Sequence, residues 1–401
     1  MTIPLRIAAN QQRTFLAFLE QILPHVGRDS ALPRRIKELL GRNRAIGSRD
    51  RRLYRELIYT TLRFLPWVRP YWDETPDFAA QMVAWLAPDL KDTTAYRTAL
   101  LDGWPAVPPS LAEKSIVLQK RTAALGGDAA HAEFSPTELL PEWFREHCPS
   151  VFESPHLDIL LARAPLWVRL QVQDRSLVLD EFSRRNWAAR PSPNFPDAFA
   201  LPPNAGVADS DAYRRGFVEI QDFGSQLVLA HAPIAAGQHW LDACAGAGGK
   251  SLQLAHHLSD LAKHGGTVGR VDATDIRPSM LEELHDRAVR ARFSNIRIVA
   301  TASGTYDGVL VDAPCSGSGT WRRLPHMKWI TTPAMLAEFA ASQLAILQAQ
   351  AGRVKFATDT GGGMLVYATC SLSTVENRDV VAAFLAAHAE FAAEPPARDC
   401  G

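Results

Sequence analysis

The chain has 401 residues, of which 47% are apolar and 21% charged, and its 43 basic side chains balance 43 acidic ones. This composition excludes an intrinsically disordered chain, and the length predicts two or three domains. No stretch of about 18 apolar residues runs without a charge, and the start lacks the pattern of a signal peptide, so we expect a cytoplasmic protein that does not enter a membrane. Five cysteines without C-x-x-C pairs fit neither a disulfide framework nor a zinc site, and we expect no metal.

Positive charge is concentrated at the N-terminus. Residues 1–72 hold fourteen Lys and Arg against five Asp and Glu, and apolar residues there recur every three or four positions, as in amphipathic helices. The pattern predicts an all-α domain over residues 1–135. Such a basic surface is typical of proteins that contact nucleic-acid phosphates, with Arg49, Arg51 and Arg52 as candidates. A solvated helix face is the alternative interpretation, and the charge alone does not choose between them.

Two further regions follow the helical one. Residues 136–222 are rich in proline, and the alternating stretch LWVRLQV at 166–172 predicts a strand, so we expect a small α+β linking subdomain. Residues 223–401 alternate strand candidates with helix candidates, which is typical of a parallel sheet wrapped by helices. The expected strands lie near 239–243, 269–274, 296–300, 306–312 and 363–369. The fold class is therefore α/β and Rossmann-like for this third region.

A glycine-rich stretch, LDACAGAGGKS, occupies residues 241–251, where the first of these strands turns into a helix. Small side chains let backbone amides approach a ligand closely, and the N-terminus of the following helix favours polar or anionic groups. Tight packing of strand against helix is the alternative interpretation. The candidate cofactor-binding residues are Cys244, Ala245, Gly246, Ala247, Gly248 and Gly249, with Cys244 as a small residue that needs no chemical role.

An acid at the end of the second strand is the usual partner of such a loop, because a carboxylate there accepts both hydroxyls of a ribose. Two candidates occur in VDATDIRPSML, Asp272 and Asp275. We prefer Asp275, because the strand should end before Arg277 and Pro278, and ligands bind at the carboxyl ends of strands in open α/β sheets.

Four motifs in one order carry a resemblance to a known family. They are QDFGSQ (221–226), CAGAGGKS (244–251), DAPCSGSGTWRRLPHMKW (312–329) and YATCSLSTVEN (367–377). Together they resemble the RsmB (Sun-type) RNA cytosine-5 methyltransferases, and the basic N-terminal run is similar to the NusB-like helical domain of many bacterial members. The resemblance implies a class I methyltransferase fold, S-adenosylmethionine as the cofactor and RNA as the substrate.

Two cysteines have roles in this family. The resemblance implies that Cys370, in the TCS motif, attacks carbon 6 of cytosine as a thiolate, and that Cys315, in the PCS motif, assists release of the product. Carbon 5 is a poor nucleophile until a thiolate adds to carbon 6, which explains the need for a cysteine. A carboxylate at Asp312 could bind the amidine edge of the base and also touch the cofactor. Lys250 resembles a family lysine that reaches the active site, and a solvated helix lysine is the alternative.

Two features depart from the family pattern. The acid that usually reads the adenine amino group is replaced by Thr301, Ala302 and Ser303, so we expect Ser303 or a backbone group to take its place. The residues after about His388 are also too few for the antiparallel hairpin that normally completes this fold. We therefore expect the strand at 363–369 to lie at an exposed edge, with the hairpin missing or supplied by a partner.

These observations and the resemblance predict an RNA cytosine-5 methyltransferase. Small-subunit ribosomal RNA is the first candidate substrate, and transfer RNA is the second. Arg322 and Arg323 follow the Cys315 loop and would suit RNA phosphates, with a surface charge pair as the alternative. We expect a monomer. The alternative function is a non-catalytic RNA-binding factor for ribosome assembly that keeps the fold without turnover.

Overall fold

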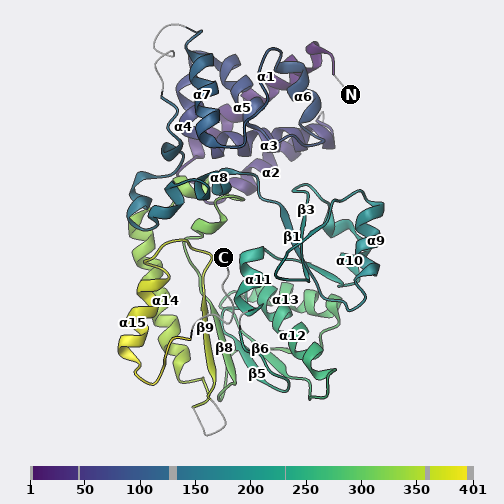
Figure 1. The fold of residues 1–401 in the computed structure, drawn as a ribbon, viewed down its shortest axis with the longest axis vertical. Helices are drawn as coiled ribbons and strands as arrows, with labels where there is room; N and C mark the ends of the chain where they lie inside the picture. Colours follow the sequence, from purple (N-terminus) through teal and green to yellow (C-terminus); the bar gives the residue numbers. More distant parts are fainter. Residues whose placement is uncertain (1–2, 44–45, 126–132, 231, 357–361, 395–401) are drawn as a thin grey trace. The chain divides into compact units, whose positions relative to one another are not determined.

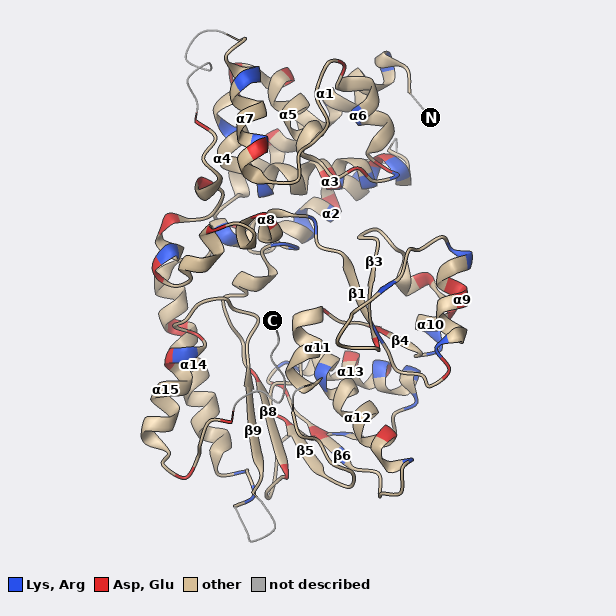
Figure 2. Ribbon diagram, viewed as in Figure 1, with Lys and Arg blue, Asp and Glu red and all other residues tan. Residues whose placement is uncertain are grey.

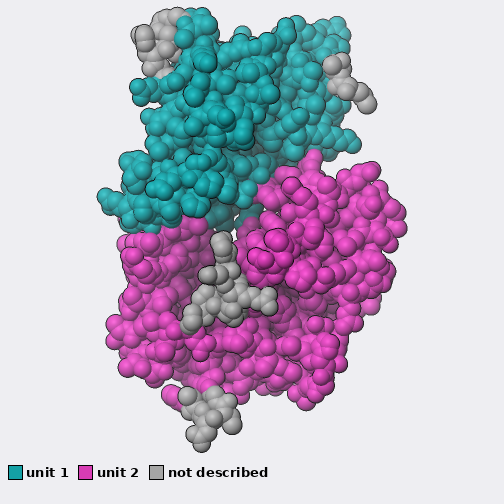
Figure 3. All heavy atoms as spheres, in the orientation of Figure 1, with its two compact units in different colours: residues 1–163, 317–333 teal, residues 164–316, 334–401 magenta. Residues whose placement is uncertain are grey.

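The structure is a computed structural model that describes residues 3–43, 46–125, 133–230, 232–356 and 362–394 (Figure 1). The chain divides into two compact units (Figure 3). The first comprises residues 1–163 and 317–333, and the second residues 164–316 and 334–401. Within the described ranges, no helix is both long and apolar enough to cross a membrane.

The first unit is built from helices, as the apolar spacing predicted. They are α1 (Leu5–Ile22), α2 (Leu32–Arg42), α3 (Ser48–Arg63), α4 (Leu65–Val68), α5 (Pro76–Leu86), α6 (Thr94–Leu100), α7 (Leu111–Thr122) and α8 (His156–Leu161). Phe15, Leu57 and Trp85, from three different helices, are almost completely buried in one core. Burial of these large apolar side chains is the main favourable term in the stability of the unit.

Residues 317–333 return from the middle of the second unit's sequence to pack in this helical core. Trp321 is 2% exposed, and its ring centroid lies 4.7 Å from that of Phe144. Backbone carbonyls hold the segment as well. Trp329 Nε1 donates to Leu62 O at 2.9 Å, and Arg63 Nη2 donates to Arg322 O at 3.0 Å. The segment is therefore an integral part of the first unit's core.

Lys328 is the most buried cation of this segment. Its Nζ donates to Arg63 O at 2.7 Å and to Leu139 O at 2.6 Å, and its side chain is 2% exposed. Burial, which penalises the charged form, lowers the pKa of Lys328 well below its ordinary value. The two carbonyl oxygens supply the hydrogen bonds that a buried polar group requires.

The units do not coincide with the three regions expected from sequence. The first unit includes residues 136–163, which were expected in the linking subdomain. It also includes residues 317–333, which were expected in the methyltransferase domain. Sequence texture missed this because membership of a unit depends on long-range contacts such as those of Trp321 and Lys328. The division into domains at residues 135 and 222 stays a prediction.

The second unit begins with a small antiparallel sheet. Its strands are β1 (Leu166–Leu170), β2 (Arg190–Pro191), β3 (Ala198–Leu201) and β4 (Val218–Ile220), in the order β2-β3-β1-β4. Helices α9 (Ser176–Arg184) and α10 (Asp211–Arg214) accompany it, and Val178 and Phe182 of α9 join the inward side chains of the strands in one apolar cluster. The strand predicted at 166–172 is thereby confirmed.

The larger sheet has five parallel strands in the order β7-β6-β5-β8-β9. They are β5 (His239–Asp242), β6 (Arg270–Ala273), β7 (Ile296–Ile298), β8 (Gly308–Asp312) and β9 (Met364–Ala368). Each lies within one of the five strands predicted from sequence, so the α/β Rossmann-like fold is confirmed. Within the described residues β9 pairs only with β8, and residues 395–401 lie outside them.

Helices cover both faces of this sheet (Figure 1). Helices α11 (Phe223–Ala230) and α12 (Gly249–Ala262) pack on the face that includes Trp240, with α13 (Pro278–Ala291) beside α12. Helices α14 (Pro333–Ala351) and α15 (Arg378–Ala387) pack on the face that includes Leu241. Neighbouring residues of a strand point to opposite faces, so Trp240 and Leu241 of β5 belong to the apolar clusters on the two faces of the sheet.

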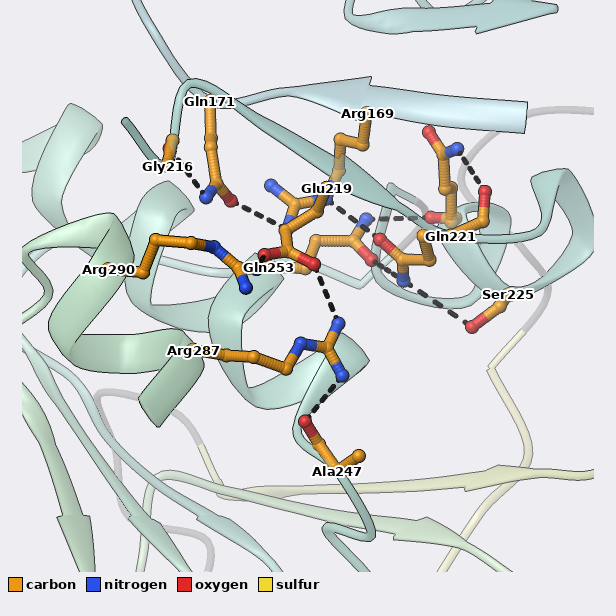
Figure 4. A network of polar contacts seen from close by, with 11 residues as sticks. Arg169, Gln171, Gly216, Glu219, Gln221, Ser225, Ala247, Gln253, Arg287 and Arg290 are labelled. Carbon is orange, nitrogen blue, oxygen red and sulfur yellow. Dashed lines mark hydrogen bonds and ion pairs between the residues drawn. The ribbon is translucent and has the colours of Figure 1, made fainter. Parts of the chain in front are cut away.

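A buried polar network joins the small sheet to α12 and α13 (Figure 4). The Glu219 side chain on β4 is 2% exposed and pairs with Arg287, at 2.7 Å, and with Arg290, both from α13. Arg287 Nη1 also donates to Ala247 O at 2.5 Å, in the glycine-rich stretch. On the neighbouring strand, Arg169 Nε donates to Gln221 Oε1 at 2.8 Å. Because buried charges need partners, this network fixes the linking sheet against the loop that α12 follows.

One glycine sets how closely β8 approaches β5. Gly308 lies opposite Trp240, and a Cβ added at Gly308 would lie 2.3 Å from the indole ring. The ring cannot move aside easily, because it is fully buried and its Nε1 donates to Gln238 Oε1 at 2.9 Å. We therefore expect Gly308→Ala to lower the free energy of unfolding by about 1–3 kcal/mol through overpacking. Thermal and denaturant unfolding followed by circular dichroism measures this change.

Gly352 provides the matched control, because a Cβ there would have no neighbour within 4 Å and the residue is exposed. Gly352→Ala should leave the unfolding midpoint nearly unchanged. Equal midpoints for the two variants would contradict the assignment of Trp240 and Gly308 as a tight contact.

Candidate active site

The glycine-rich stretch forms a tight loop between β5 and α12. Gly246 and Gly248 have φ values of +52° and +87°, a conformation that side chains with a Cβ rarely adopt. A Cβ on Gly248 would also lie 2.1 Å from Leu284 Cδ1 of α13. The loop is tied to the sheet by Ala245 N, which donates to Thr274 O at 3.0 Å. Helix α12 then begins at Gly249, so its N-terminus and the loop amides lie at one end of the sheet.

Asp275 binds this loop directly. Its Oδ2 accepts a hydrogen bond from Gly246 N at 2.8 Å, and its Oδ1 accepts from Arg277 N at 2.9 Å and from Arg277 Nε at 3.0 Å. Burial would raise the pKa of Asp275, but the hydrogen bonds from Arg277 and Gly246 outweigh it and hold the pKa below its usual range. The carboxylate is therefore ionised beside the loop at neutral pH, as recognition of ribose hydroxyls requires.

Asp272, the rival candidate, serves a different purpose. It is fully buried, accepts from Arg297 Nε and Nη2 at 2.9 and 2.6 Å, and accepts from Tyr306 OH at 3.1 Å. These hydrogen bonds lower its pKa, although burial opposes them. Because its oxygens bind protein groups within the sheet, the geometry favours Asp275 for a ligand.

The two cysteines expected to do chemistry lie together. Strands β8 and β9 pair in parallel with Asp312 opposite Ala368, so the loops that carry Cys315 and Cys370 leave the sheet side by side. The Sγ atoms are 3.2 Å apart, and Cys370 N lies 3.3 Å from Cys315 Sγ. The hydrogen bond from Cys315 lowers the pKa of the Cys370 thiol, although partial desolvation by the surrounding residues opposes this. A lowered pKa is what a nucleophilic thiolate needs.

Cys244 differs from this pair. Burial, reinforced by the nearby carboxylates of Asp242 and Asp275, raises the pKa of its thiol to about 12. The thiol therefore stays protonated at physiological pH. This agrees with the expectation that Cys244 is a small loop residue without a chemical role.

Asp312 and Lys250 form an ion pair beside the cysteines. Lys250 Nζ donates to Asp312 Oδ2 at 2.6 Å, from the first turn of α12 to the last residue of β8. Lys250 is 8% exposed, so it is not the solvated helix lysine of the alternative interpretation. Both groups influence the charge at Cys370, where Asp312 raises the thiol pKa and Lys250 lowers it.

Sequence reasoning missed Asp242, which lies at the end of β5 and is 1% exposed. Burial raises its pKa to about 7, although Ser251 Oγ donates to its Oδ2 at 2.6 Å. It also missed Glu376, whose carboxyl group accepts hydrogen bonds from Ser316, next to Cys315, and from Ser371, next to Cys370. Both residues are present in the motifs LDACAGAGGKS and YATCSLSTVEN, but a motif does not say which loop a buried carboxylate contacts.

Ser303 lies exposed in the loop between β7 and β8, and no acidic residue occurs between Ile298 and Asp307. The expected substitute for the adenine-reading acid therefore stays a prediction. Among the residues that the structure describes, no group of three His, Cys, Asp or Glu side chains could hold a metal ion.

The arginines expected to contact RNA all belong to the first unit. Arg49, Arg51 and Arg52 lie on α3. Figure 2 marks all Lys and Arg residues of the described chain in blue. Arg49 and Arg52 are exposed, and Arg52 Nε pairs with Asp92 Oδ2 at 3.0 Å. Arg323 is exposed, whereas Arg322 is half-buried, and burial lowers its pKa. The structure therefore does not bring Arg322 and Arg323 into the cysteine site's own unit, and their role stays a prediction.

Comparison with known proteins agrees with this geometry. Residues 229–398 match the family model of the 16S rRNA methyltransferase RsmB/F. The chain is 31% identical over 274 residues to the "probable ribosomal RNA small subunit methyltransferase B" of Bacillus subtilis, covering 67% of this chain and 58% of that protein. It is 27% identical to the ribosomal RNA small subunit methyltransferase B of Yersinia enterocolitica, covering 88% of this chain and 86% of that one. The chain thus spans about three fifths of the length of the first curated relatives that it matches.

Solved structures share the fold. The crystal structure of PH0851 superimposes with a TM-score of 0.65 at 17% identity, covering 97% of this chain and 90% of that one. NSun6 from Pyrococcus horikoshii superimposes with a TM-score of 0.55 at 16% identity, covering 65% of this chain and 90% of that one. The matched domain and these relatives support the RsmB (Sun-type) family of methyltransferases for this chain.

Proposed function

We propose that this protein transfers a methyl group from S-adenosylmethionine to carbon 5 of cytosine in small-subunit ribosomal RNA. The observation that carries the proposal is the pair of cysteines, Cys315 and Cys370, with Sγ atoms 3.2 Å apart at the ends of neighbouring strands. The relatives named ribosomal RNA small subunit methyltransferase B support the substrate class. Transfer RNA is the second candidate substrate.

The glycine-rich loop fits the cofactor. Positive φ at Gly246 and Gly248 gives the loop a tight conformation that residues with a Cβ rarely adopt, and the start of α12 presents backbone amides. The ionised Asp275 suits the two ribose hydroxyls. Its hydrogen bonds to the exposed Arg277 side chain can be replaced by hydrogen bonds from these hydroxyls. When bound, S-adenosylmethionine supplies an electrophilic methyl group on a sulfonium.

Cys370 is the proposed nucleophile. Its thiolate forms a bond to carbon 6 of the base, and the electron pair of the 5,6 double bond shifts toward carbon 5, which then accepts the methyl group. Afterwards the carbon 5 proton leaves, the 5,6 double bond forms again, and the bond between sulfur and carbon 6 breaks. Cys315 is proposed to assist this elimination, and its Sγ, 3.2 Å from that of Cys370, supports the proposal. The hydrogen bond between the two thiols supports division of these tasks.

Asp312 and Lys250 are proposed to hold the base. The free oxygen of a carboxylate bound to a buried lysine can accept a hydrogen bond from the amidine edge of cytosine. Such a contact favours the protonated ring, withdraws electron density from carbon 6 and promotes thiolate addition. Asp312 also lies close enough to Cys370 to influence its pKa, which agrees with a shared site.

A non-catalytic RNA-binding factor remains the alternative. It is favoured by the basic α3, where Arg49 and Arg52 are exposed and could bind phosphates without any chemistry. It does not account for the lowered thiol pKa of Cys370 or for the buried pair of Lys250 with Asp312. Measured turnover distinguishes the two functions.

The first prediction concerns the division of tasks between the cysteines. Cys370→Ala should transfer no methyl group, because carbon 6 has no nucleophile. Cys315→Ala should trap a covalent complex of protein with RNA, because elimination fails after addition. The measurement uses S-adenosylmethionine with a labelled methyl group and unmodified ribosomal or transfer RNA, and follows label in RNA and slow-migrating adduct on denaturing gels.

Cys148→Ala is the matched control, since Cys148 lies in the first unit, apart from the motifs, and should keep full activity. If the wild type binds RNA but transfers no label to either RNA, the RNA-binding factor replaces the enzyme. If Cys315→Ala turns over normally, its proposed role in release is wrong.

The second prediction concerns cofactor affinity. Asp275→Ala should weaken binding of S-adenosylmethionine by about 10- to 100-fold, as expected for loss of charged hydrogen bonds to two hydroxyls. Asp286→Ala, an exposed acid on α13, should leave affinity unchanged. Isothermal titration calorimetry measures both. A small but measurable loss in Ser303→Ala would support its contact with adenine, whereas unchanged affinity would exclude the side chain.

A further inference from the structure

Each reactive cysteine is followed by a buried serine, Ser316 after Cys315 and Ser371 after Cys370. We propose that Glu376 is a positioning residue that fastens both serines, and so sets the distance between the two thiols on which the proposed methyl transfer depends. It acts through the loops and does not touch the base. Only the expected effect of Glu376 on methyl transfer rests on the proposed function.

Glu376 is fully buried and lies between the loops. Its Oε1 accepts from Ser316 N at 2.8 Å, its Oε2 accepts from Ser371 Oγ at 2.5 Å, and Ser316 Oγ also donates to Oε2. One carboxylate thus binds groups that are 55 residues apart in sequence. Because three hydrogen bonds from the two loops meet at this one buried carboxyl group, the contact constrains both loops.

Helix α14 supplies a third anchor. Gln343 Nε2 donates to Glu376 Oε1 at 3.0 Å and to Pro314 O at 2.9 Å, one residue before Cys315. Tyr367 OH lies 3.1 Å from Gln343 Oε1 and 2.6 Å from Glu376 O. The carboxyl group is therefore held by the buried side chains of Ser316, Ser371 and Gln343, so that removing it leaves several donors unsatisfied.

The neighbouring Asn377 serves only one of the loops. Its Nδ2 donates to Ser371 O and to Ser373 O, both at 2.9 Å, and its Oδ1 accepts from Thr369 Oγ1 at 2.6 Å. These contacts shape the Cys370 loop without reaching Cys315. Among the described contacts, Glu376 therefore links the two cysteine loops, whereas Asn377 contacts the Cys370 loop alone.

The consequence for chemistry follows from the contact between the thiols. Cys315 hydrogen-bonds to Cys370 and is the largest cause of the lowered pKa of that thiol. A loop that moved by about 1 Å would weaken this contact, and misplacement of that size can reduce the rate of a reaction by about 100-fold. Glu376 therefore controls how much Cys370 thiolate is present and where it lies.

The test is Glu376→Gln, which keeps the shape but replaces one accepting oxygen with an NH2 group. The pH profile for alkylation of Cys370 by iodoacetamide should shift to higher pH, because the pKa of that thiol rises. Mass spectrometry of the peptide that contains Cys370 measures the rate. In methyl transfer, kcat should fall by about 10- to 100-fold while KM for S-adenosylmethionine is unchanged, since the cofactor loop is intact.

A double-variant experiment separates positioning from general loosening. In a Cys315→Ala background, Glu376→Gln should shift the alkylation profile no further, because the effect is transmitted through the Cys315 thiol. Asp379→Asn, which changes an exposed acid in the first turn of α15, three residues after Glu376, is the control and should leave the profile unchanged. Ser316→Ala removes one donor to Glu376 and should give a smaller shift in the same direction, which tests the proposal even if Glu376→Gln does not fold.

Two results would overturn the proposal. One is a folded Glu376→Gln with the wild-type alkylation profile, and the other is an equal shift with and without Cys315. Both are measured without RNA. If the wild type transfers no methyl group to RNA, the proposed function fails, while the alkylation profiles still decide whether Glu376 sets the thiol contact.

Discussion

The parallel pairing of β8 with β9 is the constraint on which the candidate site depends. With Asp312 opposite Ala368, the two strands end together, and Cys315 and Cys370 follow within three residues of those ends. A shift of register by one residue would turn each side chain to the other face of the sheet. The close approach of Gly308 to Trp240 fixes the other end of β8 against β5, and so also places β8 relative to the glycine-rich loop.

Local electrostatics then gives chemically different properties to similar side chains. The thiols of Cys244 and Cys370 both lie near the end of the sheet, but burial among carboxylates raises the pKa of the first, while a hydrogen bond from Cys315 lowers that of the second. Carboxylates differ in the same way. Asp275 is ionised by its hydrogen bonds to Arg277 and Gly246, whereas burial raises the pKa of Asp242 to about 7. Composition and motif spacing do not distinguish members of these pairs, because the differences arise from burial and partners.

Sequence predicted the elements well and their partners only in part. The succession of strand candidates and helix candidates placed all five parallel strands, and the rule that ligands bind at carboxyl ends of strands selected Asp275 over Asp272, a choice that the geometry favours. The contacts of Glu376 could not be predicted, because they join residues that only tertiary folding brings together. The packing of residues 317–333 in the helical unit was hidden for the same reason. Those residues carry a family motif, and a motif points to function without showing which core buries it.

The segment at residues 317–333 contributes to the core of the helical unit. Residues 317–333 begin directly after Ser316, whose hydroxyl and amide bind Glu376, and they end where α14 begins. Within the helical unit they are held by a buried lysine bound to two backbone carbonyls and by a tryptophan in the apolar core. A helical domain that only attracted RNA through its exposed arginines would need no such contribution to its core. The same short stretch of chain is therefore held at Ser316 by the carboxyl group of Glu376 in the second unit, and from Gly317 onward it belongs to the core of the first unit.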